Sequence, residues 1–430
     1  MAEATTAAFS KQPERPKLIQ IIGPGLITGA SDDDPSGIAT YSQVGAQFGF
    51  GLAWTLVISY PLMAAIQEIS ARIGRVTGTG IAGNLRRYYP AWLSGSLVFL
   101  LVGANVINLG ADLGAMGAAL KLLIDGPALL YVAGFGVLSG ALQIFTRYAR
   151  YVSILKWLSL SLFSYVICAF VVHVSWADLG RAIIHPPLSS DAGYLMAIVA
   201  VLGTTISPYL FFWQAAQEVE NEQERPEARP LKSAPADAPQ EFTRIRIDTY
   251  LGMGLSNLIA LFIVVTTAAT LHANGQTAIQ TSAQAAEALR AVAGPFTFVI
   301  FAAGIIGTGM LALPALAGSA AYAIGELLHW RVGLAKKPNR AKAFYTTIAL
   351  GMLIGVVLNL TSIDPIKALY WSAVLNGVVA VPVMCMMMRL TVRRRIMADF
   401  TLPLSLQFMG WLATAAMAAT VAAMAWSWLA

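Results

Sequence analysis

The chain has 430 residues, of which 57% are hydrophobic and only 12% are charged, about half the charged fraction of a soluble globular protein. Apolar stretches of 18 or more residues recur from end to end, so the composition excludes a soluble domain and indicates an all-α integral membrane protein. The net charge of +6 does not indicate nucleic-acid binding, because the basic residues sort by membrane side.

Eleven candidate membrane spans follow one another along the chain. Several are longer than the roughly 20 residues needed to cross a bilayer, so we expect them to tilt or protrude. They cover residues 18–47, 51–73, 93–123, 128–146, 151–174, 192–217, 246–272, 292–327, 343–361, 365–389 and 404–428.

The lysines and arginines test how these spans are oriented. If the N-terminal tail, residues 1–17, lies in the cytoplasm, 24 of the 28 basic residues fall on the cytoplasmic side and 4 fall outside. Cytoplasmic loops carry such an excess of Lys and Arg. We therefore expect a multi-pass protein of the cell membrane with a cytoplasmic N-terminus and an extracytoplasmic C-terminus.

One long polar connection divides the spans into two groups. Residues 218–243 are rich in proline and charge and have no apolar period, which predicts a flexible cytoplasmic loop. The first group, helices 1–5, covers residues 18–174. The second group, helices 6–10, covers residues 192–389 and contains this loop, and residues 404–428 add an eleventh helix.

The first span of each group is interrupted at a proline. Span 1 breaks at Asp34–Pro35, and span 6 breaks at Ser207–Pro208. Paired interruptions at equivalent positions indicate a transporter built as an inverted repeat. Because five is an odd number, the second group enters the membrane from the opposite side, and we expect the two broken helices to meet near the bilayer midplane.

Four carboxylates lie deep within predicted spans: Asp32, Asp33, Asp34 and Asp112. A carboxylate at that depth costs several kcal/mol unless it is paired, hydrated or bound to a cation, and no basic residue lies at the same depth. This balance suggests a cation as the partner. Asp34 also suits the N-cap of the second half of span 1, with Pro35 at the first helical position. Capping and cation binding are compatible, since a carboxylate has two oxygens.

The identity of the cation follows from the donor atoms in the two breaks, which are oxygens. Hard oxygen donors suit Mg²⁺, Ca²⁺ and Mn²⁺. Mg²⁺ usually keeps several waters, and small residues at the breaks would leave room for them. The candidate metal-site residues are Asp34, Ser36, Gly37, Thr204 and Ser207, with Asp33, Tyr209 and Asn376 as secondary candidates. Asn376 serves equally well in an interhelical hydrogen bond, and successive helical residues point about 100° apart, so the three adjacent aspartates cannot share one direction unless the backbone is unwound.

Four stretches resemble the NRAMP family of divalent-metal transporters. The stretch GPGLITGASDDDPSGIATYSQVGAQFGFGLAW resembles the first span of the family, whose signature is Asp-Pro-Gly-Asn. The stretch GTTISPYLFFWQ resembles the sixth span, which normally reads Met-Pro-His. Spans 2 and 3 resemble ISARIGRVTG and NLGADLGAMGAAL. The resemblance covers nearly the whole chain. It implies a fold like that of the leucine transporter (LeuT), with metal bound between broken helices 1 and 6.

The departures from the family pattern bear on the choice of metal. Asp34 matches the metal-binding aspartate, but Ser36 and Gly37 stand where the family has glycine and the ligand asparagine. In span 6, Ser207 replaces the methionine whose thioether disfavours hard ions. Thr204 replaces an alanine whose carbonyl binds metal.

Other departures concern protons. Tyr209 replaces the histidine after the proline, while Asp112 matches an aspartate of the family's proton pathway and Ala115 replaces the acid expected one turn later. The pattern resembles the NRAMP-related magnesium transporter branch. That resemblance implies transport of Mg²⁺ and Mn²⁺ without proton coupling, with Asp112 as a candidate proton or ion pathway residue.

We therefore expect a transporter and not an enzyme, with no cofactor and with Mg²⁺ or Mn²⁺ as the transported substrate. Its expected partners are the cation and the lipid bilayer, without nucleic acid or an obligate protein partner. Three alternatives stay open: a proton-coupled Mn²⁺/Fe²⁺ importer, an amino-acid or sodium symporter of the same fold, and a non-transporting sensor. The acidic cluster argues against the symporter, and the lack of a long signalling domain argues against the sensor.

Overall fold

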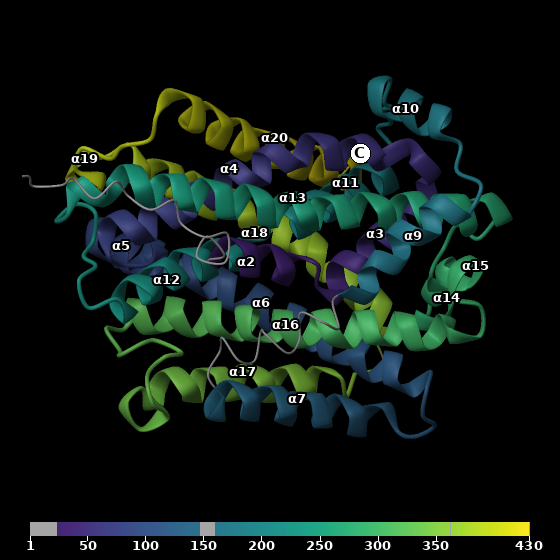
Figure 1. Ribbon diagram of the computed structural model, residues 1–430, viewed down its shortest axis with the longest axis horizontal. Helices are drawn as coiled ribbons and strands as arrows, with labels where there is room; N and C mark the ends of the chain where they lie inside the picture. The colour runs from purple at the N-terminus through teal and green to yellow at the C-terminus, as the bar shows by residue number, and fades with distance from the viewer. Residues whose placement is uncertain (1–23, 147–159, 362, 430) are drawn as a thin grey trace, which may run out of the picture.

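The computed structural model describes residues 24–146, 160–361 and 363–429, and its long helices run along one common axis (Figure 1). Within these residues, eight helical stretches are long and apolar enough to cross a membrane. A ninth results if the segment Leu160–Val171 and Trp176–Ile184, bent by 108°, forms one span. The predicted all-helical membrane architecture is confirmed. The count of eleven spans remains a prediction.

The helices of the first half are α2 (Pro24–Asp32), α3 (Pro35–Phe48), α4 (Ala53–Thr77), α5 (Ile81–Tyr88), α6 (Ala91–Lys121), α7 (Ala128–Phe145), α9 (Phe163–Val171) and α10 (Trp176–Ile184). Those of the second half are α11 (Ala192–Thr205), α12 (Pro208–Glu224), α13 (Ala238–Thr270), α14 (Ser282–Ala286), α15 (Arg290–Ala293), α16 (Thr297–Leu327), α17 (Lys342–Leu358) and α18 (Pro365–Thr391). The chain continues with α19 (Arg394–Met397) and α20 (Leu404–Leu429), and short 3₁₀ turns link several of these helices.

The difference between eight and eleven has a structural origin. Helices α3 and α4 form one helical stretch of 43 residues, joined by a 3₁₀ turn (Gly49–Leu52) whose first residue has a positive φ of 58°. At 1.5 Å per residue this stretch is about 65 Å long, enough for two crossings of a 30 Å hydrocarbon core. Helix α17 has only 17 residues. The predicted tail 1–17 and parts of the predicted spans 18–47 and 151–174 lie outside the described residues.

The broken helices occupy the centre of the bundle (Figure 1). In the most apolar window of α11 and α12, 89% of the residues are buried, against 22% for α7 and 28% for α20. Helices α7 and α17 lie along one edge of the view and α20 along the opposite edge, so these peripheral helices present apolar side chains outward. The polar residues at the two helix breaks are therefore buried inside the bundle.

Both helix breaks lie where the sequence predicts them, and proline explains each one. A helical carbonyl at Ser31 needs the amide of residue 35, but Pro35 has no N–H, so α2 ends at Asp32 and α3 begins at Pro35. In the second break, α11 ends at Thr205 and α12 begins at Pro208. Proline at the first position of α3 and α12 has the backbone angle that a helix start requires.

The predicted loop 218–243 is shorter and more ordered in the structure. Helix α12 extends to Glu224 and α13 already begins at Ala238, so the connection covers residues 225–237. Its backbone pairs with the end of α4, because the Leu231 and Lys232 amides donate to the Arg75 and Val76 carbonyls at 3.1 and 3.3 Å. Proline and charge in this segment predicted flexibility, but long-range contacts hold it.

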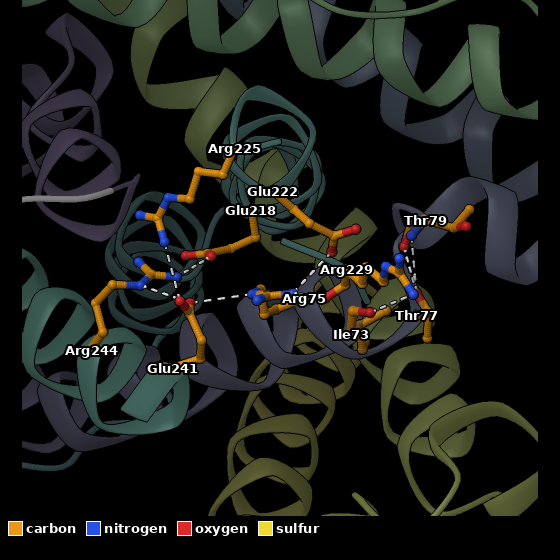
Figure 2. Close-up of polar contacts among 10 residues, drawn as sticks. All are labelled: Ile73, Arg75, Thr77, Thr79, Glu218, Glu222, Arg225, Arg229, Glu241 and Arg244. Carbon is orange, nitrogen blue, oxygen red and sulfur yellow. Dashed lines mark hydrogen bonds and ion pairs between the residues drawn. The ribbon is translucent and has the colours of Figure 1, made fainter. Parts of the chain in front are cut away.

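An ion-pair network explains why the two helices extend so far (Figure 2). Arg75 of α4 binds Glu222 of α12 at 3.1 Å and Glu241 of α13 at 3.2 Å. Arg244 of α13 binds Glu218 of α12 and lies 3.1 Å from Glu241. The Arg75 guanidinium also donates to the carbonyl of residue 229 at 2.6 Å. Charged residues that suggested a solvated loop thus pair with one another at this end of the bundle.

Candidate metal site

Asp34 caps the N-terminus of α3 with one carboxylate oxygen. Its Oδ1 accepts hydrogen bonds from the Ser36 hydroxyl at 2.6 Å and from the Gly37 amide at 2.8 Å. A cap of this kind satisfies an amide that has no partner within the helix. The predicted N-cap role is thus present, and it leaves the second oxygen, Oδ2, to face the rest of the bundle.

The second oxygen of Asp34 joins three helices. Asn108 Nδ2 of α6 and the Tyr209 hydroxyl of α12 each lie 3.2 Å from Asp34 Oδ2. The same Tyr209 hydroxyl lies 3.1 Å from the Ser31 carbonyl, the one that Pro35 leaves without an amide. Tyr209 therefore connects the start of α12 directly to the break in the first span, and the two broken helices meet at Asp34 as predicted.

Asn108 was not among the site residues predicted from the sequence. Ser372 of α18 donates to Asn108 Oδ1 at 2.7 Å, which turns the amide so that its NH₂ group faces Asp34. A polar residue at this depth in span 3 was the available signal, but its partner could not be read from the sequence. Ser372 lay outside the predicted site altogether.

In the second break, the Ser207 hydroxyl bonds to backbone carbonyls at the end of the preceding helix, α11. Its hydroxyl lies 2.7 Å from the Gly203 carbonyl and 2.9 Å from the Thr204 carbonyl, the last turn of α11, and it does not cap α12. The Thr204 carbonyl, predicted to assist the cation, accepts this bond. Both residues keep free lone pairs, and each is only 2% exposed.

The space beside Gly37 is occupied by neighbouring side chains. A Cβ atom at residue 37 would lie 3.2 Å from Tyr41 Cε2, 3.3 Å from Thr204 Oγ1 and 3.4 Å from the Asp32 carbonyl oxygen. The expectation that small residues leave this space open for a hydrated ion does not hold in this conformation. Tyr41, one turn further along α3, was not among the predicted site residues. Its ring lies beside the space that a side chain at position 37 would occupy.

Asp33 and Asp32 point away from the partners of Asp34. Ser256 of α13 has its hydroxyl 2.9 Å from Asp33 Oδ1 and 2.6 Å from Asp32 Oδ2. Asp33 was a secondary candidate for the same metal site as Asp34, but the structure directs it toward a different helix. In the described residues, no three or more His, Cys, Asp and Glu side chains converge to enclose a metal.

Two further predicted residues are buried, and their side chains make no well-formed hydrogen bond with the described residues. The Asn376 amide on α18 is 1% exposed, and it lies one turn beyond Ser372 on the helix face that reaches Asn108. Asp112 on α6 is fully buried and lies near enough to Asp34 for their charges to repel.

The site is closed to solvent in this conformation. The side chains of Asp34, Ser36, Tyr209 and Asn376 are each 1% exposed. None of the ion pairs among the described residues involves Asp34 or Asp112. The arrangement is a buried, oxygen-rich centre whose carboxylates have no basic partner among the described residues.

Comparison with known proteins places the chain in a family. A family model described as "Natural resistance-associated macrophage protein-like" (Nramp) matches residues 25–427. The chain belongs to the Nramp family. Nramp proteins are membrane transporters and not enzymes, and metal is their transported substrate and not a cofactor. The family and the apolar helices together establish a multi-pass membrane protein.

Individual relatives agree with this assignment. The chain is 26% identical over 321 residues to the divalent metal cation transporter MntH of Aeromonas hydrophila, covering 72% of this chain and 73% of that protein. The structure of a variant of the Eremococcus coleocola manganese transporter superposes with a TM-score of 0.73 at 17% identity, over 96% of this chain and 88% of that one.

A more distant structure shows how general the Nramp architecture is. Mhp1, a nucleobase-cation-symport-1 family transporter solved in a closed conformation, superposes with a TM-score of 0.56 at 14% identity. The superposition covers 94% of this chain and 92% of that one. The Nramp chain therefore shares the LeuT-type fold with a transporter of organic substrates, so its cargo must be argued from its site.

Proposed function

We propose that this Nramp protein transports hard divalent cations, chiefly Mg²⁺ and also Mn²⁺, without coupling to protons. The observation that carries the proposal is the convergence of both helix breaks on Asp34, whose recorded partners in the described chain are oxygen and nitrogen groups from Ser36, Gly37, Asn108 and Tyr209. At the second break, Ser207 contributes a hydroxyl and not a thioether. Oxygen ligands favour Mg²⁺ and Mn²⁺, and sulfur would favour later transition metals.

In this proposal Asp34 is the main charged ligand. The hydrogen bonds at Oδ1 hold the carboxylate in place, so Oδ2 is presented in a fixed direction. The Thr204 carbonyl and the Ser207 hydroxyl act partly through water, and Tyr209 and Asn376 complete the surroundings. Because Mg²⁺ gives up its waters reluctantly, contacts through water suit it better than a closed ligand cage.

Transport requires the site to open to each side in turn. We propose that the eleven spans form two inverted repeats of five with one addition, N-terminus inside, and that α2–α3 and α11–α12 move against the other helices. Tyr209 links the two moving breaks, so they rearrange together. An inside-negative potential of 100 mV would drive a divalent ion inward by about 4.6 kcal/mol.

A second candidate is a proton-coupled Mn²⁺/Fe²⁺ importer of Nramp type. It is favoured by the names of the relatives, a divalent metal cation transporter and a manganese transporter, and by the buried Asp112 near Asp34. This candidate predicts that acid pH stimulates uptake and that Mg²⁺ does not compete with Mn²⁺.

The deciding experiment uses purified protein in liposomes that contain Mg²⁺- and Mn²⁺-sensitive dyes and, separately, a pH dye. We expect influx of both metals under an inside-negative potential and no accompanying acidification. Protein-free liposomes and the Asp34→Asn variant provide the baseline. Proton entry that follows Mn²⁺ influx, or an absence of Mg²⁺ influx, would select the proton-coupled importer instead.

A further inference from the structure

A second group of buried carboxylates lies beside the proposed site but faces another helix. Asp32 and Asp33, at the end of α2, are 1% and 5% exposed. Both reach the Ser256 hydroxyl of α13, at 2.6 and 2.9 Å. The other oxygen of Asp32, Oδ1, is buried and accepts no hydrogen bond from the described residues.

Close backbone packing fixes this group in place. A Cβ atom at Gly25 would lie 2.7 Å from the Thr249 amide, and one at Gly29 would overlap the Gly252 carbonyl, so only glycine lets α2 approach α13 so closely. The Gly25 amide also donates to Asp248 at 2.6 Å. Asp33 directly follows the last residue of α2, and its carboxylate reaches Ser256 of α13.

Among the described residues, Asp32 Oδ1 has no hydrogen-bond donor, and Asp32 Oδ2 and Asp33 Oδ1 share the Ser256 hydroxyl. A serine hydroxyl carries one proton, so Ser256 can donate to only one of the two oxygens at a time. None of the ion pairs among the described residues includes Asp32 or Asp33. Adjacent buried carboxylates without a counter-charge repel each other and cost several kcal/mol, which a bound cation would offset.

Ser256 Oγ lies 2.6 Å from Asp32 Oδ2 and 2.9 Å from Asp33 Oδ1, so the two carboxylates meet at one hydroxyl. The C-terminal end of α2 also points at the break, and the carbonyls at a helix C-terminus favour positive charge.

We propose that Asp32, Asp33 and Ser256 form a second divalent-cation site, separate from Asp34 and completed by water. The proposal rests on the proposed function only in that the cargo is a divalent metal. Two carboxylates and one hydroxyl provide a net charge of −2, which matches such an ion. The two sites would hold successive cations on either side of the unwound backbone.

The test is the number of metal ions bound per chain. Purified full-length protein in lipid nanodiscs is equilibrated with Mn²⁺, and bound Mn²⁺ is obtained from the loss of the free-ion electron paramagnetic resonance signal. We expect about two ions for the unmodified chain, and about one for Asp34→Asn and for the double variant Asp32→Asn/Asp33→Asn. In Ser256→Ala the weaker of the two affinities should fall by about 10- to 100-fold.

Two variants serve as matched controls. Asp248→Asn changes a buried carboxylate on the same helix contact, and Ser59→Ala removes a buried hydroxyl that contacts α13 at Asn257. Both should still bind two ions. If the double aspartate variant fails to fold, Ser256→Ala with its Ser59→Ala control decides the matter.

One bound ion in the unmodified chain, lost in Asp34→Asn, would overturn the second site. So would two ions in the double variant, which would mean that Asp32 and Asp33 hold protons and not metal. Failure of the proposed function is recognised separately, because the liposome experiment would then show no Mg²⁺ influx whatever the number of bound ions.

Discussion

The ion-pair network at the end of α4 and the aspartates of the first helix break are both buried and rich in carboxylates, yet they are built in opposite ways. In the network, Glu218, Glu222 and Glu241 each have an arginine partner (Figure 2). Among the described residues, none of the ion pairs includes the three aspartates of the break, Asp32, Asp33 and Asp34. The glutamates of the network are neutralised by arginines of the same chain. The aspartates of the break have no such partner among the described residues, and we propose that a cation takes that role.

The contrast separates structural carboxylates from transport carboxylates. Arginine is the residue best suited to buried ion pairs, because its planar group binds carboxylates through several donors. Where a carboxylate has arginine partners, its burial indicates a structural tie between helices. Asp34 has only neutral donors among its recorded partners, and in the proposed function a mobile cation supplies the missing positive charge.

The largest effect should come from Asp34→Asn. Asparagine keeps the N-cap function but removes the charge, so we expect metal flux into liposomes to fall at least about 100-fold with normal folding. Asp364→Asn is the matched control, because Asp364 also caps a helix before a proline and binds the Ile366 amide at 2.9 Å. Equal loss of flux in both variants would mean that capping, and not cation binding, is what Asp34 contributes.

Arg75→Gln should act on stability. It leaves Glu222 and Glu241 without their shared partner, and breaking a buried ion pair costs about 3–5 kcal/mol. Thermal unfolding in detergent should show a clear decrease in Tm. Arg181→Gln, which breaks an ion pair whose side chains are 75% and 51% exposed, should cost less than about 1 kcal/mol. Similar Tm values for the two variants would contradict the structural role of the network.

Added metal should distinguish the two regions directly. Mn²⁺ at about 100 times its Kd stabilises the folded state by about 2.7 kcal/mol. Because each bound ion adds this stabilisation, we expect the same increase in Tm for the unmodified chain and for Arg75→Gln, and an increase smaller by the contribution of one ion for Asp34→Asn. A metal-dependent rise that disappears in Arg75→Gln would place a cation in the ion-pair network and reverse the comparison.

The smallest effect should come from Ser372→Ala. Ser372 orients Asn108, which in turn contacts Asp34, and one neutral hydrogen bond contributes about 1 kcal/mol. We expect KM for Mg²⁺ to rise about fivefold with little change in the maximal rate. Ser319→Ala is the control, because the Ser319 hydroxyl also bonds an asparagine of α6, accepting from Asn105 Nδ2 at 2.8 Å, and this pair does not contact Asp34. A fall in maximal rate with unchanged KM would argue against positioning.

The sequence was sufficient for features that depend on local chemistry. Apolar length located the membrane helices, and the missing amide of Pro35 and Pro208 located both breaks. The convergence of the breaks at Asp34 also followed, because paired interruptions have a known geometric meaning. Each of these features depends on a single residue or on one continuous stretch of sequence. None of them depends on contacts between side chains that are far apart in the chain.

Features that depend on distant contacts were missed or misplaced. Asn108 and Ser372 become part of the site only because α6 and α18 pack beside the break. The direction of Asp33 could not be predicted, because an unwound backbone has no helical period. The order of residues 225–237 depends on Arg75, which lies about 150 positions earlier in the chain.

The way residues 225–237 lie on α4 has a practical consequence for labelling the protein. Leu231 is fully buried and its amide bonds to α4, whereas Arg225, Pro226 and Glu227 are exposed. A fluorophore or affinity tag inserted after Pro226 would extend away from the bundle, while the same insertion at Leu231 would pull the connection off α4. Within this connection, the exposed stretch after Arg225 is therefore where an inserted reporter should disturb the packing least.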